Sequence, residues 1–295
     1  MFLSAHVRLK RQLKVENSLL TLKNVTHEVV DNTLVISITK DAQFNSFIHV
    51  DDIIESTSKV KIICKENSFV KLLVEKYDAK QKFEFVLEKN ANVKLNFLSL
   101  EHKATGEYTF DLAEASELHV AMADLSDANV DFTSYINLNG DNSYAEWHLA
   151  SLGAGDNQKV FNINFDHYGK NTYGNMSNYG VVEDAAFTHF KGISYIHNKS
   201  VESKTHQSVK IMVFDEKCHA KANPILKIDE NDIEASHAAV VGKVNDEHMF
   251  YLCSRGIKEN DAKQLITLGY LKPITKYFED ENDVNRIVQG IEKRL

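Results

Sequence analysis

The chain has 295 residues, of which 43% are hydrophobic and 26% charged, so it can bury the core of one large domain or two ordinary ones. Its formal net charge of −8 argues against nucleic acid as a partner. Cys64, Cys218 and Cys253 lie too far apart for a CxxC motif. This spacing argues against a disulfide framework or a thiolate-rich zinc site and favours a reducing compartment. No apolar run approaches the roughly 20 residues of a membrane span, and the N-terminus has no signal-peptide pattern, so we expect a cytoplasmic protein without a membrane partner.

Short strands with one buried face are the main pattern along the chain. The sequence FNINFDH places Phe161, Ile163 and Phe165 on one face and polar residues on the other. Similar two-residue periods recur between about residues 6 and 255, and we find no convincing helical period there. Clusters of Asn, Asp and Gly separate the strands as turns, and GKNTYGNMSNYG (169–180) is interpreted as a long turn.

The predicted strands recur in two interleaved series with intervals of 20-odd residues. The series begin at Val60, Phe83, Tyr108 and Val130, and at Val70, Val93, Leu118 and Ala145. A recurring unit of this length is typical of a solenoid, because one coil alone does not bury its apolar face. We therefore expect an all-β parallel β-helix. A sandwich or a barrel stays open as an alternative, since strands also recur at short intervals there.

Helical patterns follow at the C-terminus. The sequence KENDAKQLITLGY predicts a helix with Asn260 as N-cap and Gly269 as its stop, and DENDVNRIVQGIEKRL predicts a second helix with an apolar side. We therefore divide the chain into a β-helix core at 1–257 and a C-terminal helical region at 258–295. Two interpretations of these helices stay open: a bundle that caps the last coil, or a docking surface for another protein.

The chain lacks the common motifs for nucleotide binding and hydrolysis. GxxxxGK[ST], GxGxxG after a strand, GxSxG and HExxH are all absent. Most of the histidines stand singly, and His102, His119 and His148 resemble ordinary polar members of alternating strands. A β-helical polysaccharide lyase or hydrolase is the enzymatic alternative, but it needs carboxylates clustered on one face, and here they are scattered among turns. We expect no catalytic residue.

Residues 180–271 resemble the C-terminal core of the SufB/SufD family, the scaffold components of the SUF iron–sulfur cluster assembly machine. The similar elements, in order, are FKG, KANPILKI, IEASHAAVVG followed by FYLCSRGI, and DAKQLITLGY. The resemblance implies a right-handed parallel β-helix with a small C-terminal helical region and no enzymatic activity. It also implies two partners: a SufB-like chain paired through the β-helix, and a SufC-like ATPase docked on the helices. A self-pairing homodimer is the alternative assembly.

The segment around His237 resembles the SufD branch of this family. Ala238 follows His237 where SufB chains have Glu, and Ala235 stands where many SufD chains have Cys. The resemblance implies that His237 is a ligand of a transient iron–sulfur cluster at the subunit interface, with no tightly bound cofactor. Imidazole suits such a role, and a packed, hydrogen-bonded His is the alternative. The chain is expected to begin directly with strands, without the N-terminal domain of longer relatives.

The resemblance also implies a set of partner-binding residues for the ATPase. These are Arg255, Gly256, Ala262, Leu265 and Ile266. Gly256 equally suits a turn between the last strand and the first helix, and Arg255 suits an anchor of that junction through carbonyl groups. Cys253 lies in the aromatic run that we assign to the last strand, so we expect a buried thiol there.

Overall fold

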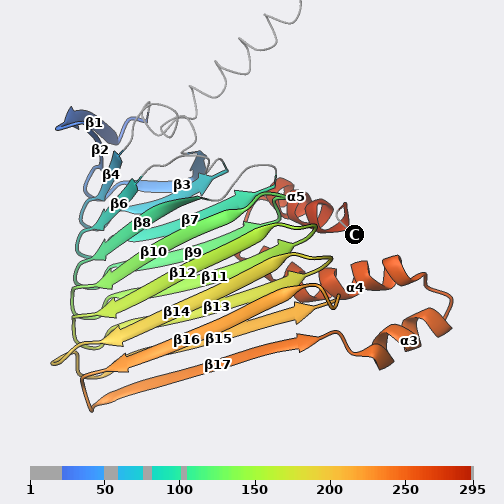
Figure 1. Ribbon diagram of the computed structural model, residues 1–295. Coiled ribbons are helices and arrows are strands. Elements are labelled where there is room, and N and C mark those ends of the chain that lie inside the picture. The colour runs from blue at the N-terminus through green and yellow to red at the C-terminus, as the bar shows by residue number, and fades with distance from the viewer. Residues whose placement is uncertain (1–21, 50–58, 76–81, 101–104, 294–295) are drawn as a thin grey trace, which may run out of the picture.

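The computed structural model describes residues 22–49, 59–75, 82–100 and 105–293 and shows a β-solenoid followed by helices (Figure 1). Two sheets face each other, and from β2 onward the chain alternates between them strand by strand. The prediction of a parallel β-helix with a small helical region at the C-terminus is confirmed. The expected start of the chain concerns residues 1–21, which lie outside the described residues.

The two sheets differ by one strand. The nine-stranded sheet contains, in spatial order, β1 (Val25–Val30), β2 (Thr33–Ile38), β4 (Lys59–Cys64), β6 (Lys82–Leu87), β8 (Thr105–Leu112), β10 (Val130–Leu138), β12 (Gln158–His167), β14 (Phe187–Ile196) and β16 (His219–Ile228). The eight-stranded sheet contains, from its opposite end, β3 (Gln43–His49), β5 (Phe69–Val74), β7 (Asn92–Ser99), β9 (Glu117–Asp124), β11 (Tyr144–Gly153), β13 (Tyr173–Val182), β15 (Ser203–Val213) and β17 (Ile233–Lys243). β1 and β2 pair antiparallel, and the other described pairs are parallel.

The repeat seen in the sequence is the coil of the solenoid. Val70, Val93, Leu118 and Ala145 are successive register partners in the eight-stranded sheet, and all four are fully buried. Because side chains alternate between the two faces of a strand, this register places every second residue inside the solenoid. The buried alternate residues of the two sheets therefore form one continuous core.

Aromatic side chains stack from coil to coil within this core. Tyr108 lies between Phe83 and Phe132, with ring centroids 5.1 and 5.0 Å away. Phe85 and Phe110 stack in the same way at 4.9 Å. Phe83 and Tyr108 are register partners, as are Phe85 and Phe110, so parallel pairing brings these rings face to face. Phe132 is the register partner of Gly106 and reaches Tyr108 from two residues along its strand.

A recurring turn connects several strands of the nine-stranded sheet to the next strand of the eight-stranded sheet. Asn67, Asn90, Asn142 and Asn171 occupy its left-handed position, with φ of 58°, 56°, 59° and 50°. Asn tolerates this conformation better than other residues with a side chain. The amides also bond between coils, since Asn90 donates to Asn67 at 3.0 Å and Asn171 donates to Asn142 at 2.7 Å. Ala115 holds the same position, with φ 54°, and interrupts this row of amides.

The prediction of a long turn at 169–180 is wrong for most of its length, because β13 begins at Tyr173. The inward residues of this strand are Gly174, Met176, Asn178 and Gly180, which are all buried. A Cβ atom on Gly180 would lie 2.9 Å from the Phe190 ring, so the close approach requires glycine. Small and polar residues at the inward positions hide the hydrophobic alternation that marks the other strands.

The helical region contains α3 (Asp246–Ser254), α4 (Glu259–Leu271), the 3₁₀ helix η2 (Lys272–Tyr277) and α5 (Glu281–Glu292). It begins at Asp246 and not at residue 258, and the aromatic run at 249–251 is helical. The sequence pattern does not reveal α3, because none of its residues is buried and its apolar residues form no inward stripe. Cys253 is therefore exposed, and the prediction of a buried thiol is wrong.

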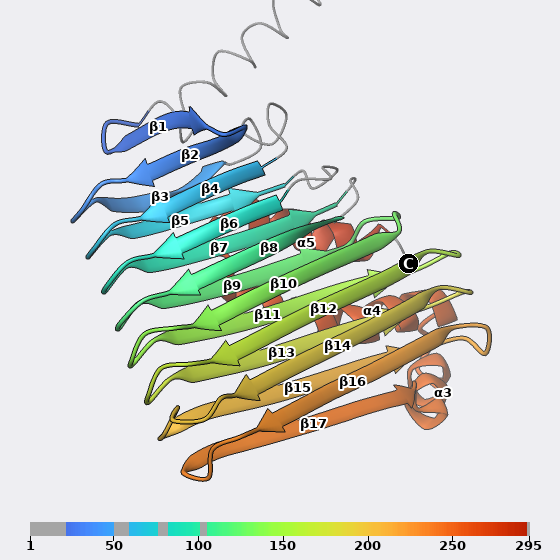
Figure 2. The same ribbon diagram turned by 60° about the vertical axis from the view of Figure 1, so that its left-hand side comes forward.

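The later helices cover the outer face of the eight-stranded sheet (Figure 2). Leu271, Ile287 and Ile291 pack with Ala123 and Leu152 in a second core outside the solenoid. The stripe predicted for α5 is confirmed, and Asp280 caps this helix through a bond from the backbone N–H of Asn282. The predicted ends of α4 are wrong, since Lys258 occupies its N-cap and Gly269 lies inside the helix.

Candidate association site

The C-terminal end of the solenoid is open. β16 and β17 are the last strands of their sheets, and no further coil of the described chain covers them. Ile228, Val240 and Val241 are 39%, 57% and 46% exposed. A strand at a sheet end presents free N–H and C=O groups that pair readily with another strand. At the other end of the nine-stranded sheet, the antiparallel strand β1 covers β2.

His237 lies on the open strand β17. Its register partner is Gln207 of β15, and its own side chain is exposed. Among the described residues no group of three His, Cys, Asp or Glu side chains could hold a metal ion. A metal or cluster bound by His237 therefore needs further ligands from another chain.

Helix α3 extends from the end of β17 and exposes aromatic side chains. Phe250 and Tyr251 are 75% and 55% exposed, and no residue of the helix is buried. The Arg255 guanidinium lies 5.1 Å from the centre of the Tyr251 ring, within the range of a cation–π contact. We call Phe250, Tyr251 and Arg255 the α3 surface. Exposed aromatic and arginine side chains of this kind are typical of protein–protein contacts.

The structure separates the expected partner-binding residues into two groups. Arg255, Gly256 and Leu265 are exposed. Ala262 is fully buried, and Ile266 packs against the second core, so both face the eight-stranded sheet. Gly256 has φ +86° and donates its N–H to the Cys253 carbonyl, so it ends α3 and turns the chain into α4. The turn thus joins two helices, and not a strand and a helix.

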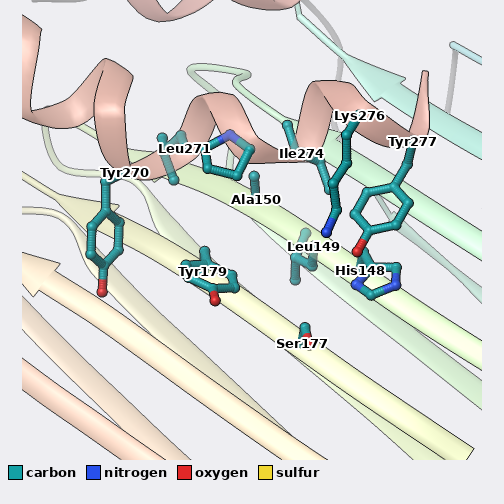
Figure 3. A pocket seen from close by; sticks show the side chains of 11 residues that line it. His148, Leu149, Ala150, Ser177, Tyr179, Tyr270, Leu271, Ile274, Lys276 and Tyr277 are labelled. Atoms are coloured by element: carbon teal, nitrogen blue, oxygen red, sulfur yellow. The ribbon is translucent and has the colours of Figure 1, made fainter. Parts of the chain in front are cut away.

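A polar groove lies between η2 and the outer face of the eight-stranded sheet. It is a cavity of about 220 Å³, and His119, Glu146, His148, Lys276 and Tyr277 are among its lining residues. The His148 ring stacks on Tyr277, with centroids 3.9 Å apart (Figure 3). Toward its other end, η2 bounds a smaller cavity of about 110 Å³.

Polar side chains in the groove interact across β9 and β11. Glu146 Oε2 lies 3.5 Å from His119 Nδ1 and 3.8 Å from His148 Nε2. His119 first and His148 second hold the pKa of the Glu146 carboxyl well below its usual range. From the sequence, both histidines resemble ordinary strand residues. The signal was nevertheless present, because the repeat that aligns Leu118 with Ala145 also aligns His119 with Glu146.

These features define a class of protein: a β-solenoid with an open strand pair and an exposed helix at the same end, suited to association with other chains. The chain belongs to the SufB/SufD core family. A sequence model of that family, described as "SUF system FeS cluster assembly, SufBD core domain", matches residues 37–270. The resemblance seen in the sequence is therefore confirmed, and the match extends far upstream of residue 180, where that resemblance began.

Curated relatives include both branches of the family. The chain is similar to the iron–sulfur cluster assembly protein SufD of Bacillus subtilis (strain 168), with 32% identity over 180 residues, 61% of this chain and 41% of the relative. It is 27% identical to SufB of the same organism over 143 residues, 48% of this chain and 30% of the relative. It is 28% identical to SufD of Escherichia coli (strain K12) over 115 residues, 39% of this chain and 27% of the relative. The chain thus matches less than half the length of each of these relatives. Within the described residues, no helix is long and apolar enough to cross a membrane.

Proposed function

We propose that this chain is a cytoplasmic, non-enzymatic scaffold subunit of the SufD type in iron–sulfur cluster assembly. It pairs with a SufB-like chain through the last coil of its solenoid and docks a SufC-like ATPase through the α3 surface. The observation that carries the proposal is the open strand pair β16 and β17 at the end of a family-defining solenoid. The partners themselves come from the family resemblance.

The open strands support pairing with another solenoid of the same kind. Each sheet can continue across the interface, because the free edge groups of β16 and β17 then bond to strands of the partner. Exposed Val240 and Val241 supply apolar area beside these strands. Apolar contact and main-chain bonds together stabilise such an interface.

The docking role of α3 rests on its lack of intramolecular packing. A helix of this length is marginal alone in water and is stabilised mainly by contacts of an apolar face. Its nine residues, Asp246–Ser254, contribute no buried residue, so Phe250 and Tyr251 are available to a partner. Ala262 and Ile266 contribute indirectly, by fixing α4 on the solenoid.

His237 supplies a ligand for the transient cluster, which is the cargo of the assembly and not a resident cofactor. Its imidazole is exposed on the strand that meets the partner. One imidazole binds a cluster only together with groups from the partner, such as thiolates, and incomplete ligation of this kind permits later transfer. Ala235 leaves no thiolate of this chain two residues away.

The pairing surface is tested with Val240→Asp, which places a charge on the open strand. The matched control is Val29→Asp, at a position 68% exposed on β1 at the opposite end. Mass measurement of the full chain, alone and with a SufB-like chain, should show a heterodimer that is lost only in Val240→Asp. Unchanged pairing of Val240→Asp would contradict the assignment, and a homodimer of the chain alone would support self-pairing through the same strands.

The docking surface is tested by Phe250→Ala combined with Tyr251→Ala. Loss of two exposed aromatic contacts should weaken co-purification with a SufC-like ATPase by tenfold or more. Tyr135→Ala, at a position 40% exposed on β10, is the control and should bind normally. Deletion of 258–295 is less suitable, because it uncovers the second core. Normal binding by the double variant would refute the α3 assignment.

The role of His237 is tested by His237→Ala in the assembled complex. We expect cluster yield, followed by visible absorption, to decrease while complex assembly stays intact. His189→Ala is the control, since His189 bonds to Asn223 on the nine-stranded sheet, away from β17. A normal cluster yield in His237→Ala would show that His237 is not needed as a cluster ligand and has only a structural role.

A further inference from the structure

The smaller cavity, of about 110 Å³, lies between the α4–η2 segment and the strands β11 and β13 (Figure 3). Its lining combines polar groups on several elements with a set of aliphatic side chains. Ser177 and Tyr179 of β13 and Tyr270 of α4 contribute hydroxyl groups, and Lys276 of η2 contributes an ammonium group. We propose that this cavity binds a small aliphatic monocarboxylate.

These hydroxyl and ammonium groups can all donate hydrogen bonds. A Lys ammonium is a donor only, and a Ser or Tyr hydroxyl can donate as well as accept. Burial, and then the nearby Tyr179, raises the pKa of the Tyr270 hydroxyl, so this group keeps its proton at neutral pH. In the part of the chain that the structure describes, no Asp or Glu lines the cavity. A ligand that accepts hydrogen bonds and carries negative charge therefore fits this lining, and a cation does not.

The charges beside the cavity favour a monoanion. A hydrogen bond to Tyr277 is the main cause that raises the pKa of Lys276, and this bond uses one of the three ammonium donors. Lys210, the register partner of Tyr179, places a second ammonium nitrogen 5.5 Å from the centre of the Tyr179 ring. Glu146 in the neighbouring groove also attracts Lys276, but it already contacts two imidazoles. Two ammonium groups against one carboxylate leave positive charge for the ligand.

The size of the cavity and its aliphatic side select the rest of the ligand. A water molecule takes about 30 Å³ in the liquid, and drug-sized ligands occupy pockets of about 300–1,000 Å³. A cavity of about 110 Å³ therefore admits only a small molecule. Aliphatic side chains pack against a short alkyl chain but leave the further oxygens of phosphate or sulfate without donors. The aliphatic residues that line the cavity are Leu149, Ala150, Leu271, Pro273 and Ile274.

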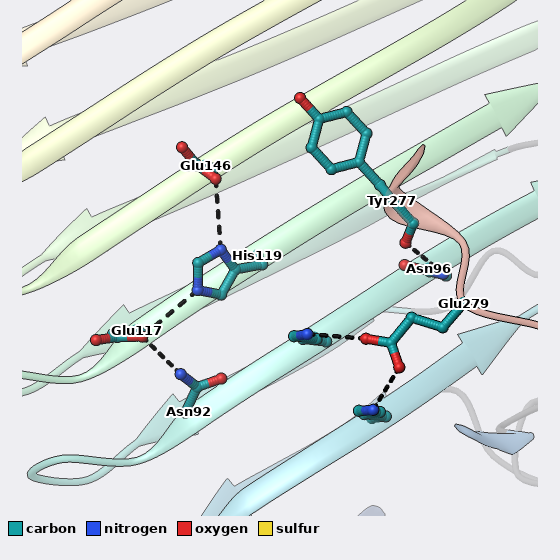
Figure 4. Close-up of polar contacts among 9 residues, drawn as sticks. Asn92, Asn96, Glu117, His119, Glu146, Tyr277 and Glu279 are labelled. Atoms are coloured by element: carbon teal, nitrogen blue, oxygen red, sulfur yellow. Dashed lines mark hydrogen bonds and ion pairs between the residues drawn. The ribbon is translucent and has the colours of Figure 1, made fainter. Parts of the chain in front are cut away.

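The wall that η2 provides is anchored to the eight-stranded sheet. Asn96 Nδ2 donates to the Tyr277 carbonyl at 3.3 Å, and Glu279 pairs with Lys94 at 2.8 Å (Figure 4). These contacts hold η2 over the strands in the absence of a ligand. A preformed site loses less conformational entropy when it binds, so even a small ligand can be retained.

A carboxylate bound here contacts both the helical region and the solenoid. A ligand that binds only the folded arrangement stabilises it by mass action, so occupancy strengthens the attachment of the α4–η2 segment to the sheet. The level of a small carboxylate is thereby linked to the position of the C-terminal helices. None of the lining residues belongs to β17 or α3, so the inference does not depend on the proposed partners.

The test titrates the full chain with butyrate and follows the methyl NMR signals of isoleucine-labelled protein. The signal of Ile274, assigned through Ile274→Val, should shift and saturate. The signal of Ile193, which lies on the other sheet, should stay unchanged. Saturation of the Ile274 signal gives the affinity, and the unchanged Ile193 signal shows that the effect is confined to the cavity.

Three variants test the polar groups and the space. Lys276→Met removes the ammonium group and should weaken butyrate binding by about tenfold or more. Tyr179→Phe removes one hydroxyl, keeps the ring, and should weaken binding by a smaller factor. Ser177→Leu fills the cavity and should abolish binding. The matched control is Lys227→Met, because the Lys227 ammonium lies 5.7 Å from the centre of the Tyr195 ring on the other sheet.

Two further probes separate the charge of the ligand from its alkyl chain. Butanol has the chain without the charge, inorganic phosphate has the charge without the chain, and both should bind more weakly than butyrate. Circular dichroism establishes that each variant is folded before titration. Saturable butyrate binding that is weakened in Lys276→Met and kept in Lys227→Met supports the site. Shifts that do not saturate at millimolar butyrate, equal affinity in Lys276→Met, or tighter binding of phosphate or butanol overturns it.

Discussion

The early and late coils of the solenoid have different interiors. In the middle of the early strands the inward side chains are apolar, as Ile62 and Phe85 illustrate, both 0% exposed. From β10 onward polar side chains enter the interior, including Ser134, Asn178 and Gln207, which are 0%, 0% and 3% exposed. The early coils are thus stabilised by hydrophobic burial, whereas the late coils bury groups that cost free energy unless they are paired.

The polar groups of the late coils are only partly paired. Gln207 donates to Ser194 Oγ at 2.7 Å and to the Ile225 carbonyl at 3.2 Å, but its own Oε1 has no partner among the described residues. Within the described ranges, neither amide atom of Asn178 has a hydrogen-bond partner. We therefore expect the late coils, which lead to the open strands, to be the less stable part of the solenoid.

The largest effect is expected in the early coils. Phe85→Ala removes a fully buried ring from an aromatic stack and should lower the free energy of unfolding by about 3–5 kcal/mol, measured in urea. Tyr135→Ala on the exposed face of β10 is the control, and its effect should stay within about 0.5 kcal/mol. A loss below about 1 kcal/mol for Phe85→Ala would contradict a tightly packed early core.

The late coils should respond in the opposite direction. Asn178→Leu replaces an unpaired buried amide with an apolar side chain of similar size, between its register partners Leu149 and Val209. The free energy of unfolding should rise by about 1–3 kcal/mol. A decrease instead would show that the amide is paired with something inside the solenoid, such as buried water.

A third prediction uses the pH dependence of the late coils. Burial, followed by Asp184, raises the Glu183 pKa to about 7 from its usual 4.5, with Lys263 opposing and Asp215 adding to the shift. Between these pH values the folded carboxyl keeps a proton that the unfolded chain has lost. The stability contributed by protonated Glu183 is therefore complete below pH 4.5 and is lost as pH rises through 7.

Glu183→Gln keeps this side chain neutral at every pH. At pH 8 the variant should be more stable than wild type by about 1–2 kcal/mol, and the gain should vanish below pH 4.5. Urea unfolding across pH 4–8 measures both limits. Asp184→Asn, at the adjacent exposed position, serves as a comparison and should give a smaller gain. A gain independent of pH would rule out titration of Glu183 as the cause.

The smallest effect concerns the recurring turn, which is found in both early and late coils. Ala115→Asn restores the row of amides between Asn90 and Asn142 at a left-handed position. The melting temperature should rise by an amount equivalent to about 0.5–1 kcal/mol. Ala115→Gly relieves the backbone conformation without adding an amide, so an equal gain in both variants would show that interruption of the row has no energetic cost.

The difference between the apolar early coils and the more polar late coils also explains how far the sequence predicts the fold. Where the interior is apolar, the two-residue period predicts the strands, and the Val70 to Ala145 series gives the register. In β13 the inward positions carry Gly174 and Asn178, and the period fails. No face of α3 is buried, so its aromatic run shows no helical period. It therefore resembles an aromatic run in a strand.

The sequence also predicts the open strand and the groove beneath η2 to different extents. The segment around His237 is contiguous in sequence, so resemblance alone locates it on the open strand, while its role as a ligand stays a prediction. The set of His119, Glu146 and His148 depends on pairing between strands and on η2 folding back over them. The strand series supplies the pairing, but no local pattern in the sequence places η2 above these strands.

The C-terminal helices have a mechanical consequence for the solenoid. In a stacked solenoid each coil contacts only its neighbours, so the array can fray from one end, coil by coil. Here Glu279 bridges Lys71 and Lys94 at 2.5 and 2.8 Å, and Arg286 pairs with Glu75. These bonds link residues 185 to 211 positions apart along the chain. The C-terminal helical segment is thereby tied to the early coils, so these ion pairs oppose separation of the early coils from the rest of the solenoid.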